Sequence, residues 1–367
     1  MKFSCEKHLL LAAVNTASRA ASAKSPIPAL EGILIEAGEK VKFTGYDLKE
    51  GIYTSIPADV AAPGAVVLGA RLLGEIVRSL PDGVVTIAID RGSLANISCQ
   101  KSEFSIMGTA AEDYPEIQGV EEGFTFSLPQ KTLRSMIDQT VFAVSANESR
   151  PVYTGSLFEI ENGTLSVVSV DGYRLAMRRE KLDAGGEEHS FIVPGAALSD
   201  VEKICADSED PVEITAGAKQ IRFSFGETVL ISRRLEGEFL NYKKAVPNNF
   251  NTFAVAEKAD FQRVIERVSL IIDDKIKNPL RCSFSLDSIE LLCVTSQGRA
   301  EDSVSVMGAG LPVEIGFNNR YLLDALRACK CEKIKLLAGG PLAPMRIVPL
   351  EGDAFCFLVL PVRLKTE

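Results

Sequence analysis

The chain has 367 residues, of which 46% are hydrophobic and 24% charged, and its formal net charge is −9. This length exceeds one ordinary core and suits two or three domains of about 100–150 residues, and the composition is typical of a soluble globular protein. No apolar run reaches the roughly 18–20 residues that span a bilayer, and the acidic balance argues at first against a nucleic-acid partner.

The chain begins with MKFSCEKHLLLAAV, a stretch that superficially suggests a signal peptide. Glu6, Lys7 and His8 interrupt it, and the apolar positions that follow recur at helical spacing. We therefore expect a strand followed by a helix of the mature protein, and a cytoplasmic location.

The first predicted unit holds two helices, each preceded by a strand and followed by a hairpin. A short alternating strand around Phe3 leads into a helix over 7–24, and alternation within 30–52 predicts a hairpin. A further strand then runs into an amphipathic helix over 71–80, and the segment ISCQKSEFSIMG closes the unit with a second hairpin.

The same order of elements recurs twice more. FTFSLPQKTL, at Phe124, and NTFAVAEKADF, at Asn251, resemble the opening MKFSCEKHLL. The spacing is roughly 125 residues, which is one domain length. The helices predicted in these two copies cover 130–150, 194–205, 257–272 and 319–330.

Three repeats predict three domains, at 1–121, 122–247 and 248–367. The polar segments EDYPEIQGVEEG and AVPNNFN are the expected linkers. Because each unit reads strand–helix–hairpin twice, we expect an α+β fold, in which two helices pack on antiparallel sheets.

The segment VSVDGYRLAM holds the best candidates for chemistry, Asp171 and Arg174. Tyr46-Asp47 and Ser296-Gln297-Gly298 occupy the equivalent places in the other two repeats. A catalytic pair would not usually recur in altered form at three places, whereas a turn at a strand end would. The chain also lacks a phosphate-binding loop and a nucleophile elbow. Binding or structural use is therefore favoured over catalysis, with a hydrolase that uses Asp171 as a distant alternative.

The eight cysteines are scattered through apolar stretches without the spacing of a metal clip. We expect them to be buried free thiols. His8 and His189 stand far apart, which argues against a histidine-based metal site. No metal and no cofactor is expected.

The charge is unevenly distributed. The predicted helices carry more lysine and arginine than aspartate and glutamate, whereas the strands and loops are strongly acidic. If the helices share one face, that face is basic and attracts phosphate. Solvated lysines that only confer solubility are the alternative.

The triple repeat, the SVDGYRLAM segment, EGEFLNYKKAVP and the terminal LVLPVRL together closely resemble the bacterial DNA polymerase III beta subunit family, the sliding clamps. The resemblance covers the chain from Met1 to Leu364. It implies that the three clamp domains form half of a ring, which a second copy closes into a homodimer around duplex DNA. It also implies a non-enzymatic processivity factor that holds the replicative polymerase, the clamp loader and repair proteins through short peptides.

The resemblance places a hydrophobic peptide pocket between the second and third domains. Its expected lining comprises Tyr153, Val170, Gly172, Tyr173, Arg174, Leu175, Leu240, Lys244, Ala245, Leu342, Pro344, Leu358, Val359, Leu360, Pro361, Val362 and Arg363. Family members often carry histidine at Tyr173, threonine at Val170, proline at Leu240 and arginine at Lys244. The resemblance therefore does not determine which peptide this chain prefers.

Further positions carry over from the resemblance or from helix placement. Leu270 and Ile271 match the family's apolar pair at the dimer contact, with burial in the fifth helix as the alternative. A repeat-built scaffold that binds peptides but no nucleic acid remains the second function. The expected DNA contacts are Lys24, Arg78, Lys131, Arg134, Arg150, Lys203, Arg263 and Lys277.

Overall fold

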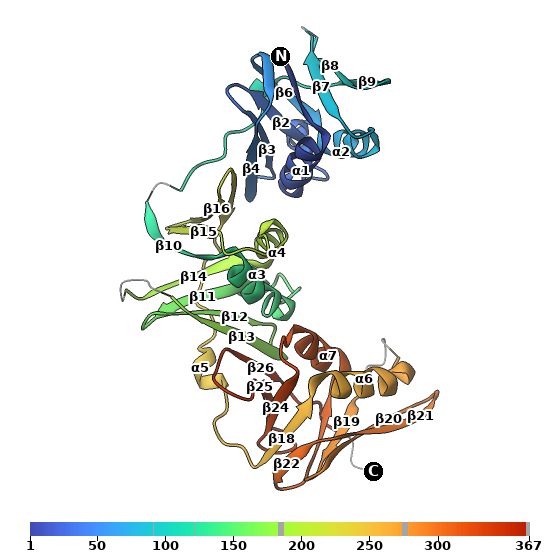
Figure 1. The fold of residues 1–367 in the computed structure, drawn as a ribbon. Coiled ribbons are helices and arrows are strands. Elements are labelled where there is room, and N and C mark those ends of the chain that lie inside the picture. Colours follow the sequence, from blue (N-terminus) through green and yellow to red (C-terminus); the bar gives the residue numbers. More distant parts are fainter. Residues whose placement is uncertain (91, 121, 183–186, 274–277, 365–367) are drawn as a thin grey trace. The chain divides into compact units, whose positions relative to one another are not determined.

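The computed structural model describes residues 1–90, 92–120, 122–182, 187–273 and 278–364 (Figure 1). The chain divides into two compact units. One comprises Met1–Arg134 with Asp200–Arg234, and the other comprises Ser135–Ser199 with Leu235–Glu367. In the described ranges no helix is long and apolar enough to cross a membrane.

The order of helices and strands repeats three times, as the sequence predicts, and the α+β fold class is confirmed. The first repeat holds β1 (Lys2–Glu6), α1 (Lys7–Ala17), η1 (Ser18–Ala20), η2 (Pro28–Glu31), β2 (Gly32–Ala37), β3 (Val41–Tyr46), β4 (Glu50–Ile56), β5 (Asp59–Ala62), β6 (Gly64–Gly69), α2 (Ala70–Ser79), β7 (Val84–Ile89), β8 (Leu94–Cys99) and β9 (Ser102–Met107), and η3 (Ala111–Asp113) follows it.

The second and third repeats follow the same scheme. The second holds β10 (Gly123–Pro129), α3 (Gln130–Asp138), η4 (Val141–Ala143), η5 (Pro151–Thr154), β11 (Gly155–Glu161), β12 (Thr164–Val170), β13 (Arg174–Lys181), β14 (His189–Pro194), α4 (Gly195–Ile204), β15 (Pro211–Gly217), β16 (Gln220–Phe225) and β17 (Thr228–Arg233). After a short helix α5 (Tyr242–Ala245), the third holds β18 (Thr252–Glu257), α6 (Lys258–Val268), η6 (Ser269–Ile271), β19 (Leu280–Phe284), β20 (Ser288–Thr295), β21 (Gly298–Ser305), β22 (Met307–Gly310), β23 (Val313–Phe317), α7 (Asn319–Ala328), β24 (Lys333–Ala338), β25 (Met345–Val348) and β26 (Phe355–Val359).

The predicted hairpin after each of the six repeat helices is wrong in its number of strands, because a meander of three paired strands stands there. In the first half of each repeat the additional strand is β4, β13 or β21, and these strands differ in burial. β4 alternates between buried and partly exposed positions, whereas β21 is polar and largely exposed. Since the three copies share no hydrophobic pattern, alternation alone does not reveal this strand.

Three predicted helices are too long, and the one predicted over 257–272 ends at Val268. The helix predicted over 130–150 ends at Asp138, and the helix predicted over 7–24 ends at Ala17. At these ends the hydroxyls of Thr140 and Ser18 donate to the carbonyls of Met136 and Val14, at 2.8 and 2.6 Å. Such side-chain bonds compete with the helical ladder, and a 3-10 turn follows each of them.

In the first unit, strands of two repeats join into one sheet. The eight-stranded sheet has the order β10-β15-β16-β17-β4-β3-β2-β6, and β17 pairs antiparallel with β4 from Thr228↔Thr54 to Ser232↔Glu50. A five-stranded sheet of order β5-β1-β7-β8-β9 completes the unit, with β9 at its edge.

In the second unit, strands of two repeats likewise join into one sheet, and we call such a pairing a joint. Its nine-stranded sheet has the order β14-β11-β12-β13-β26-β25-β24-β18-β22, and β13 pairs with β26 from Arg174↔Val359 to Arg178↔Phe355. The accompanying four-stranded sheet has the order β21-β20-β19-β23, with β21 at its edge.

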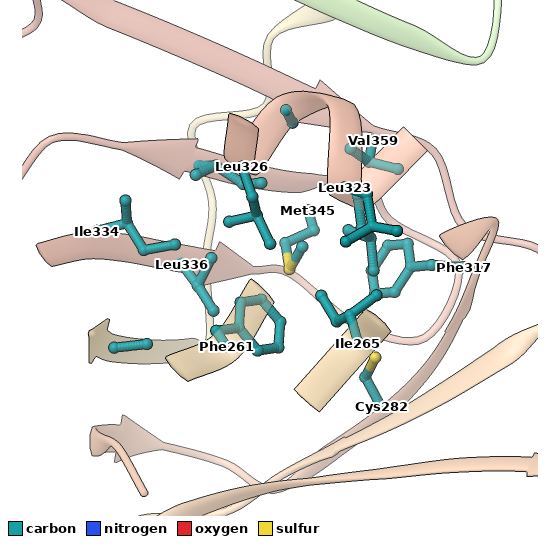
Figure 2. Packing of buried hydrophobic residues seen from close by; sticks show 14 of the residues in the cluster. Phe261, Ile265, Cys282, Phe317, Leu323, Leu326, Ile334, Leu336, Met345 and Val359 are labelled. Carbon is teal, nitrogen blue, oxygen red and sulfur yellow. The ribbon is translucent and has the colours of Figure 1, made fainter. Parts of the chain in front are cut away.

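The core of the third repeat lies between its two helices and its two sheets (Figure 2). Phe261 of α6 and Leu326 of α7 are fully buried and belong to the same cluster as Ile334, Met345 and other strand residues. Helices that bury one face in this way hold the strand ends of β13 and β26 in place, and the candidate site lies at those strand ends.

Candidate functional site

Asp171 forms the turn between β12 and β13. Its Oδ1 atom accepts hydrogen bonds from the backbone N–H groups of Tyr173 and Arg174, at 2.8 and 3.0 Å. Gly172, between them, has φ +93°, a conformation that favours glycine. Asp171 is therefore a turn-forming residue, as the repeat comparison predicts.

The first repeat builds the same turn with a different third residue. Asp47 Oδ1 accepts from the N–H groups of Lys49 and Glu50, at 2.8 and 2.7 Å. Glu50 therefore occupies the place of Arg174. Because this position holds an acid in one repeat and a base in another, the feature that repeats is the turn and not a catalytic pair.

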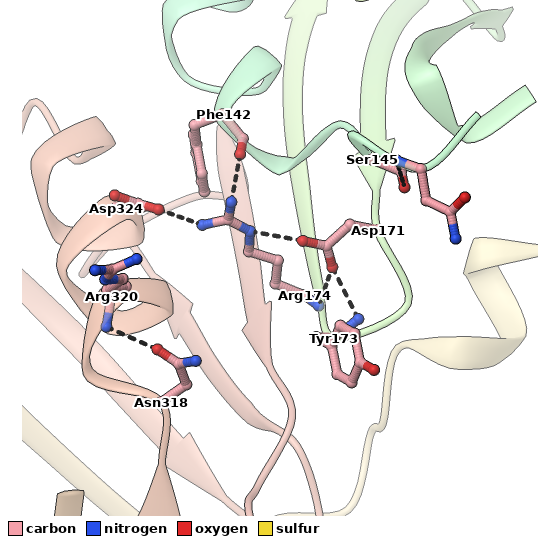
Figure 3. Close-up of polar contacts among 9 residues, drawn as sticks. Phe142, Ser145, Asp171, Tyr173, Arg174, Asn318, Arg320 and Asp324 are labelled. Atoms are coloured by element: carbon pink, nitrogen blue, oxygen red, sulfur yellow. Dashed lines mark hydrogen bonds and ion pairs between the residues drawn. The ribbon is translucent and has the colours of Figure 1, made fainter. Parts of the chain in front are cut away.

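Arg174 connects the turn to helix α7 and to η4 (Figure 3). Its Nε atom donates to Asp171 Oδ2 at 3.0 Å, Nη1 donates to Asp324 Oδ2 at 2.5 Å, and Nη2 donates to the carbonyl of Phe142 at 2.7 Å. The Arg174 side chain is only 12% exposed, so its planar guanidinium serves to position the turn, α7 and η4.

Tyr173 is the exposed part of the turn. Its side chain is 61% exposed, and its ring stacks on that of Tyr321 with centroids 6.0 Å apart and planes at 22°. The guanidinium of Arg174 lies over the other ring, 4.7 Å from the centroid of Tyr321. Burial, followed by the nearby Asp171 carboxylate, raises the pKa of Tyr321. The two rings and the arginine form one aromatic surface.

Tyr321 and Asn318 were not predicted from the sequence. Helix α7 begins where Asn318 Oδ1 accepts the N–H of Arg320 at 3.0 Å, an N-cap that sets the start of the helix and hence the face on which Tyr321 lies (Figure 3). A single tyrosine in an amphipathic helix gives no signal that distinguishes this role from ordinary packing.

The segment after β26 runs beside Tyr173. The N–H of Leu360 donates to the carbonyl of Tyr173 at 2.9 Å, and the N–H of Val362 donates to that of Gly316 at 2.7 Å. These bonds bring the predicted residues Leu360–Val362 next to the turn and to the chain that enters α7. Leu342 and Pro344 lie before β25, whose Met345 is the register partner of Val359.

An apolar floor lies below these strand ends. Leu175 and Leu358 are register partners, each 3% exposed, and they belong to one buried cluster with Tyr242. Val152 and Phe239 pack against the same cluster. The floor is thus built from β13, β26, η5 and the linker that holds α5.

The predicted pocket residues include a buried set, an exposed set and a partly buried set, which holds Tyr153, Arg174, Pro344 and Pro361. Val170, Leu175, Leu358 and Val359 are buried and form floor or sheet core. The exposed large hydrophobic side chains are Tyr173, Leu240, Leu342, Leu360 and Val362, and Lys244 and Arg363 are exposed as well. Apolar exposed residues beside a buried apolar floor are what a short apolar peptide requires.

The predicted DNA contacts lie on or beside helices. Several of them form ion pairs on the surface, including Lys131 with Glu209 and Lys203 with Asp200. Lys277 lies outside the described residues. The candidates that the structure describes are all exposed: Lys24, Arg78, Lys131, Arg134, Arg150, Lys203 and Arg263.

Leu270 and Ile271 belong to the 3-10 turn η6, after the end of α6 at Val268. Leu270 is 84% exposed, so its burial in the fifth helix, the alternative considered from the sequence, is wrong. Ile271 is half-buried and packs against the core of the third repeat.

The cysteines carry no metal-binding geometry. All eight are free, and among the described residues no group of three or more His, Cys, Asp or Glu side chains could hold a metal ion. Burial raises the pKa of Cys5 to about 11 and that of Cys205 to about 12, so these thiols are protonated at neutral pH.

Known proteins share this organisation over the whole chain. Models of the DNA polymerase III beta subunit match residues 1–118 (N-terminal domain), 127–241 (central domain) and 243–363 (C-terminal domain). A beta sliding clamp from Halalkalibacterium halodurans is 33% identical over 99% of this chain and 100% of its own length.

Solved structures agree with the sequence matches. The sliding clamp of Bacillus subtilis has a TM-score of 0.95 at 31% identity and covers 100% of both chains. The clamp of Pseudomonas aeruginosa bound to griselimycin has a TM-score of 0.94 at 26% identity, over 99% of this chain and 100% of that one. The chain therefore belongs to the DNA polymerase III beta subunit family.

Proposed function

We propose that this protein is a DNA sliding clamp, a processivity factor that forms no covalent bond with its partners and catalyses no reaction. Two copies close into a ring around duplex DNA in the cytoplasm. The ring holds the replicative polymerase, the clamp loader and repair proteins through short peptides that bind beside Tyr173. Full-length similarity to beta sliding clamps supports the general function, and features of this chain support the finer points.

The pairing of strands supports the homodimer, and this is the single observation that carries the ring. At both joints within the chain, the last strand of one repeat pairs with the third strand after the first helix of the repeat before it: β17 with β4, and β26 with β13. The remaining members of the series are β9 and β21, and each is the edge strand of its sheet. If β9 of one copy pairs with β21 of the other, no strand of the series remains at a free sheet edge, and two copies close the ring.

The helices support the same pairing. The sixth residue of the second helix is acidic in each repeat: Glu75 in α2, Asp200 in α4 and Asp324 in α7. Within the chain, Asp200 pairs with Arg19 of η1 at 3.3 Å, and Asp324 pairs with Arg174 beside η4.

Among the residues that the structure describes, the third such contact has no counterpart within one copy. The residue of η6 that corresponds to Arg19 is Leu270, which is 84% exposed. The side chain of Glu75 is 54% exposed and pairs only with its helix neighbour Arg71 among the described contacts. We therefore expect Leu270 of one copy to pack beside Glu75 and Leu72 of helix α2 of the other.

The exposed basic residues support binding to DNA through phosphates. They stand on helices and adjoining loops of all three repeats, although the net charge of the chain is −9. Contacts to phosphate alone carry no base sequence, and this suits a protein that must slide. A closed ring then retains the polymerase at high effective concentration near the primer end.

Retention of the protein on circular and on linear DNA tests this function. The protein is loaded onto a nicked circular plasmid, unbound protein is removed by gel filtration, and half of the sample is cut once with a restriction enzyme. A clamp stays with the circle and leaves the linear DNA within minutes. Equal retention on both forms would contradict the proposal and would favour binding along the DNA surface.

A further inference from the structure

The linker over 236–250 carries three of the predicted pocket residues, Leu240, Lys244 and Ala245. Its own backbone hydrogen bonds are local: the N–H of Lys244 donates to the carbonyl of Asn241, and that of Val246 to Tyr242. Among the described backbone hydrogen bonds, those that tie the chain to a sheet lie outside the linker, at Leu235 and Asn251. Side chains must therefore hold this segment in place.

Tyr242 and Lys243 provide the main attachment. The Tyr242 ring is 3% exposed, and its hydroxyl donates to Glu159 Oε2 at 2.5 Å. Lys243 Nζ lies 3.0 Å from Glu159 Oε2 and 2.6 Å from Glu161 Oε2. Since Glu159 and Glu161 are two residues apart on β11, they project from the same face of the strand. We call these four residues the linker clasp.

Tyr242 and Lys243 both keep their protons at neutral pH. Burial and the hydrogen bond to Glu159 raise the pKa of Tyr242 to about 12, so its hydroxyl remains a donor. Partial burial lowers the pKa of Lys243, but hydrogen bonds to Glu161 and Glu159 outweigh this effect and raise it overall. Both residues therefore remain hydrogen-bond donors to the glutamates of β11 over the physiological range.

A second attachment lies on the other side of Leu240. The ring of Phe239 makes an edge contact with Tyr153, with centroids 5.6 Å apart at 85°. Leu240, 39% exposed, thus lies between two anchored residues, Phe239 and Tyr242. Tyr242 also belongs to the buried cluster of Leu175 and Leu358, so the clasp fixes the linker against the apolar floor.

We propose that Glu159 is a positioning residue for the partner-peptide site: acting through Tyr242 and Lys243, it fixes Leu240 and Lys244 against the floor before a peptide arrives. This inference rests on the proposed peptide-binding function of that site. The physical basis is preorganisation, because a linker ordered in advance does not lose its conformational entropy when the ligand binds.

Griselimycin, which the structure of the Pseudomonas aeruginosa clamp contains, serves as the probe. Its affinity for the full chain is measured by calorimetry, and hydrogen exchange of 236–250 is followed by mass spectrometry in the free protein. We expect Glu159→Ala to weaken binding about tenfold and to accelerate exchange in the linker, with exchange in β12 and β13 unchanged.

Two further variants separate positioning from general destabilisation. Glu159→Gln keeps an acceptor for the Tyr242 hydroxyl and should retain most of the affinity, within about threefold of wild type. Glu213→Ala removes another strand carboxylate with an arginine partner, Arg222 at 3.1 Å, and should leave both affinity and linker exchange unchanged.

The possible outcomes are distinct. If Glu159→Ala binds griselimycin within twofold of wild type, the inference is wrong, whatever the exchange data show. If the wild-type chain does not bind griselimycin, the proposed site fails, and the inference fails with it. If Glu159→Ala does not fold, Tyr242→Phe replaces it, because it removes only the hydroxyl. Unchanged affinity and linker exchange in that variant would overturn the inference.

Discussion

Arg174 and Asp324 stand 150 residues apart in the sequence, and Nη1 of the arginine donates to Oδ2 of the aspartate at 2.5 Å. This contact links the turn after β12 to the second helix of the third repeat. It also holds the aromatic pair of Tyr173 and Tyr321 beside the candidate peptide site.

Replacing Arg174 by methionine should lower the free energy of unfolding by about 3 kcal/mol, because Asp171 and Asp324 lose a poorly exposed partner. Urea unfolding followed by circular dichroism measures this change. Arg179→Met is the matched control on the same strand. Its partner Asp353 is 72% exposed, so the loss there should stay below about 1 kcal/mol. Equal losses in both variants would contradict the role assigned to Arg174.

Glu50 should make stability depend on pH. Its side chain is 8% exposed, and Oε1 has no hydrogen-bond partner among the described residues. Burial, then Asp200 and Asp47, raise its pKa from 4.5 to about 8. The folded chain therefore keeps this proton to a higher pH than the unfolded chain does, so its stabilising effect is complete below about pH 4.5 and is lost as the pH rises through 8.

The variant Glu50→Gln should flatten this dependence, since glutamine has the shape of the protonated acid and does not ionise. Thermal unfolding at intervals between pH 6 and pH 9 measures the difference, which we expect to reach about 2–3 kcal/mol at pH 9 in favour of the variant. Glu227→Gln, which removes an exposed carboxylate of the same unit, should follow the wild type. A Glu50→Gln profile parallel to that of the wild type would refute the assignment.

Leu270→Asp should convert the dimer into a monomer, because it places a charge where we expect the partner's helix α2. Light scattering coupled to gel filtration gives the mass directly. Leu350→Asp is the control, since Leu350 is also exposed, at 44%, but lies between β25 and β26, which belong to a different sheet from β21. A Leu270→Asp variant that keeps the mass of the dimer would exclude η6 from the interface.

Charge reversal at Lys24 and Arg150 should weaken DNA association. We expect the combined variant to bind short duplex DNA about tenfold more weakly at low salt, and its dependence on salt concentration to become shallower. Lys40→Glu is the control, because this exposed lysine sits in the β2–β3 turn and pairs with Glu227. Fluorescence anisotropy at several salt concentrations gives both quantities. Wild-type affinity in the double variant would exclude Lys24 and Arg150 as DNA contacts, and a wild-type protein that binds no DNA would favour the peptide-binding scaffold.

Local patterns in the sequence predicted the repeated elements and the turn at Asp171. Strand alternation around Phe3 and Phe253 is short-range, and an aspartate two residues before a backbone N–H forms its turn without distant help. The predictions that failed concern elements whose structure depends on tertiary contacts. The third strand of each meander shows this, because β4 is buried at most positions while β21 is polar and largely exposed.

The candidate site shows the same division. Leu175 and Leu358 could be placed by resemblance, but no local signal links Arg174 to Asp324 or Tyr173 to Tyr321. Those contacts depend on the register between β13 and β26, and this register brings together residues from two repeats. The linker clasp was missed for the same reason, because Glu159 and Tyr242 are 83 residues apart.

The turns at Asp47 and Asp171 have one backbone and two kinds of side chain. Since the aspartate side chain and a backbone hydrogen bond hold the turn, the side chain three places later can change without altering the fold. At one joint that residue is an arginine engaged on three sides, and at the other it is a proton-holding glutamate. The joints between repeats thus share one turn but can differ in rigidity and in their response to pH. Substitution at this one position can therefore change each joint separately.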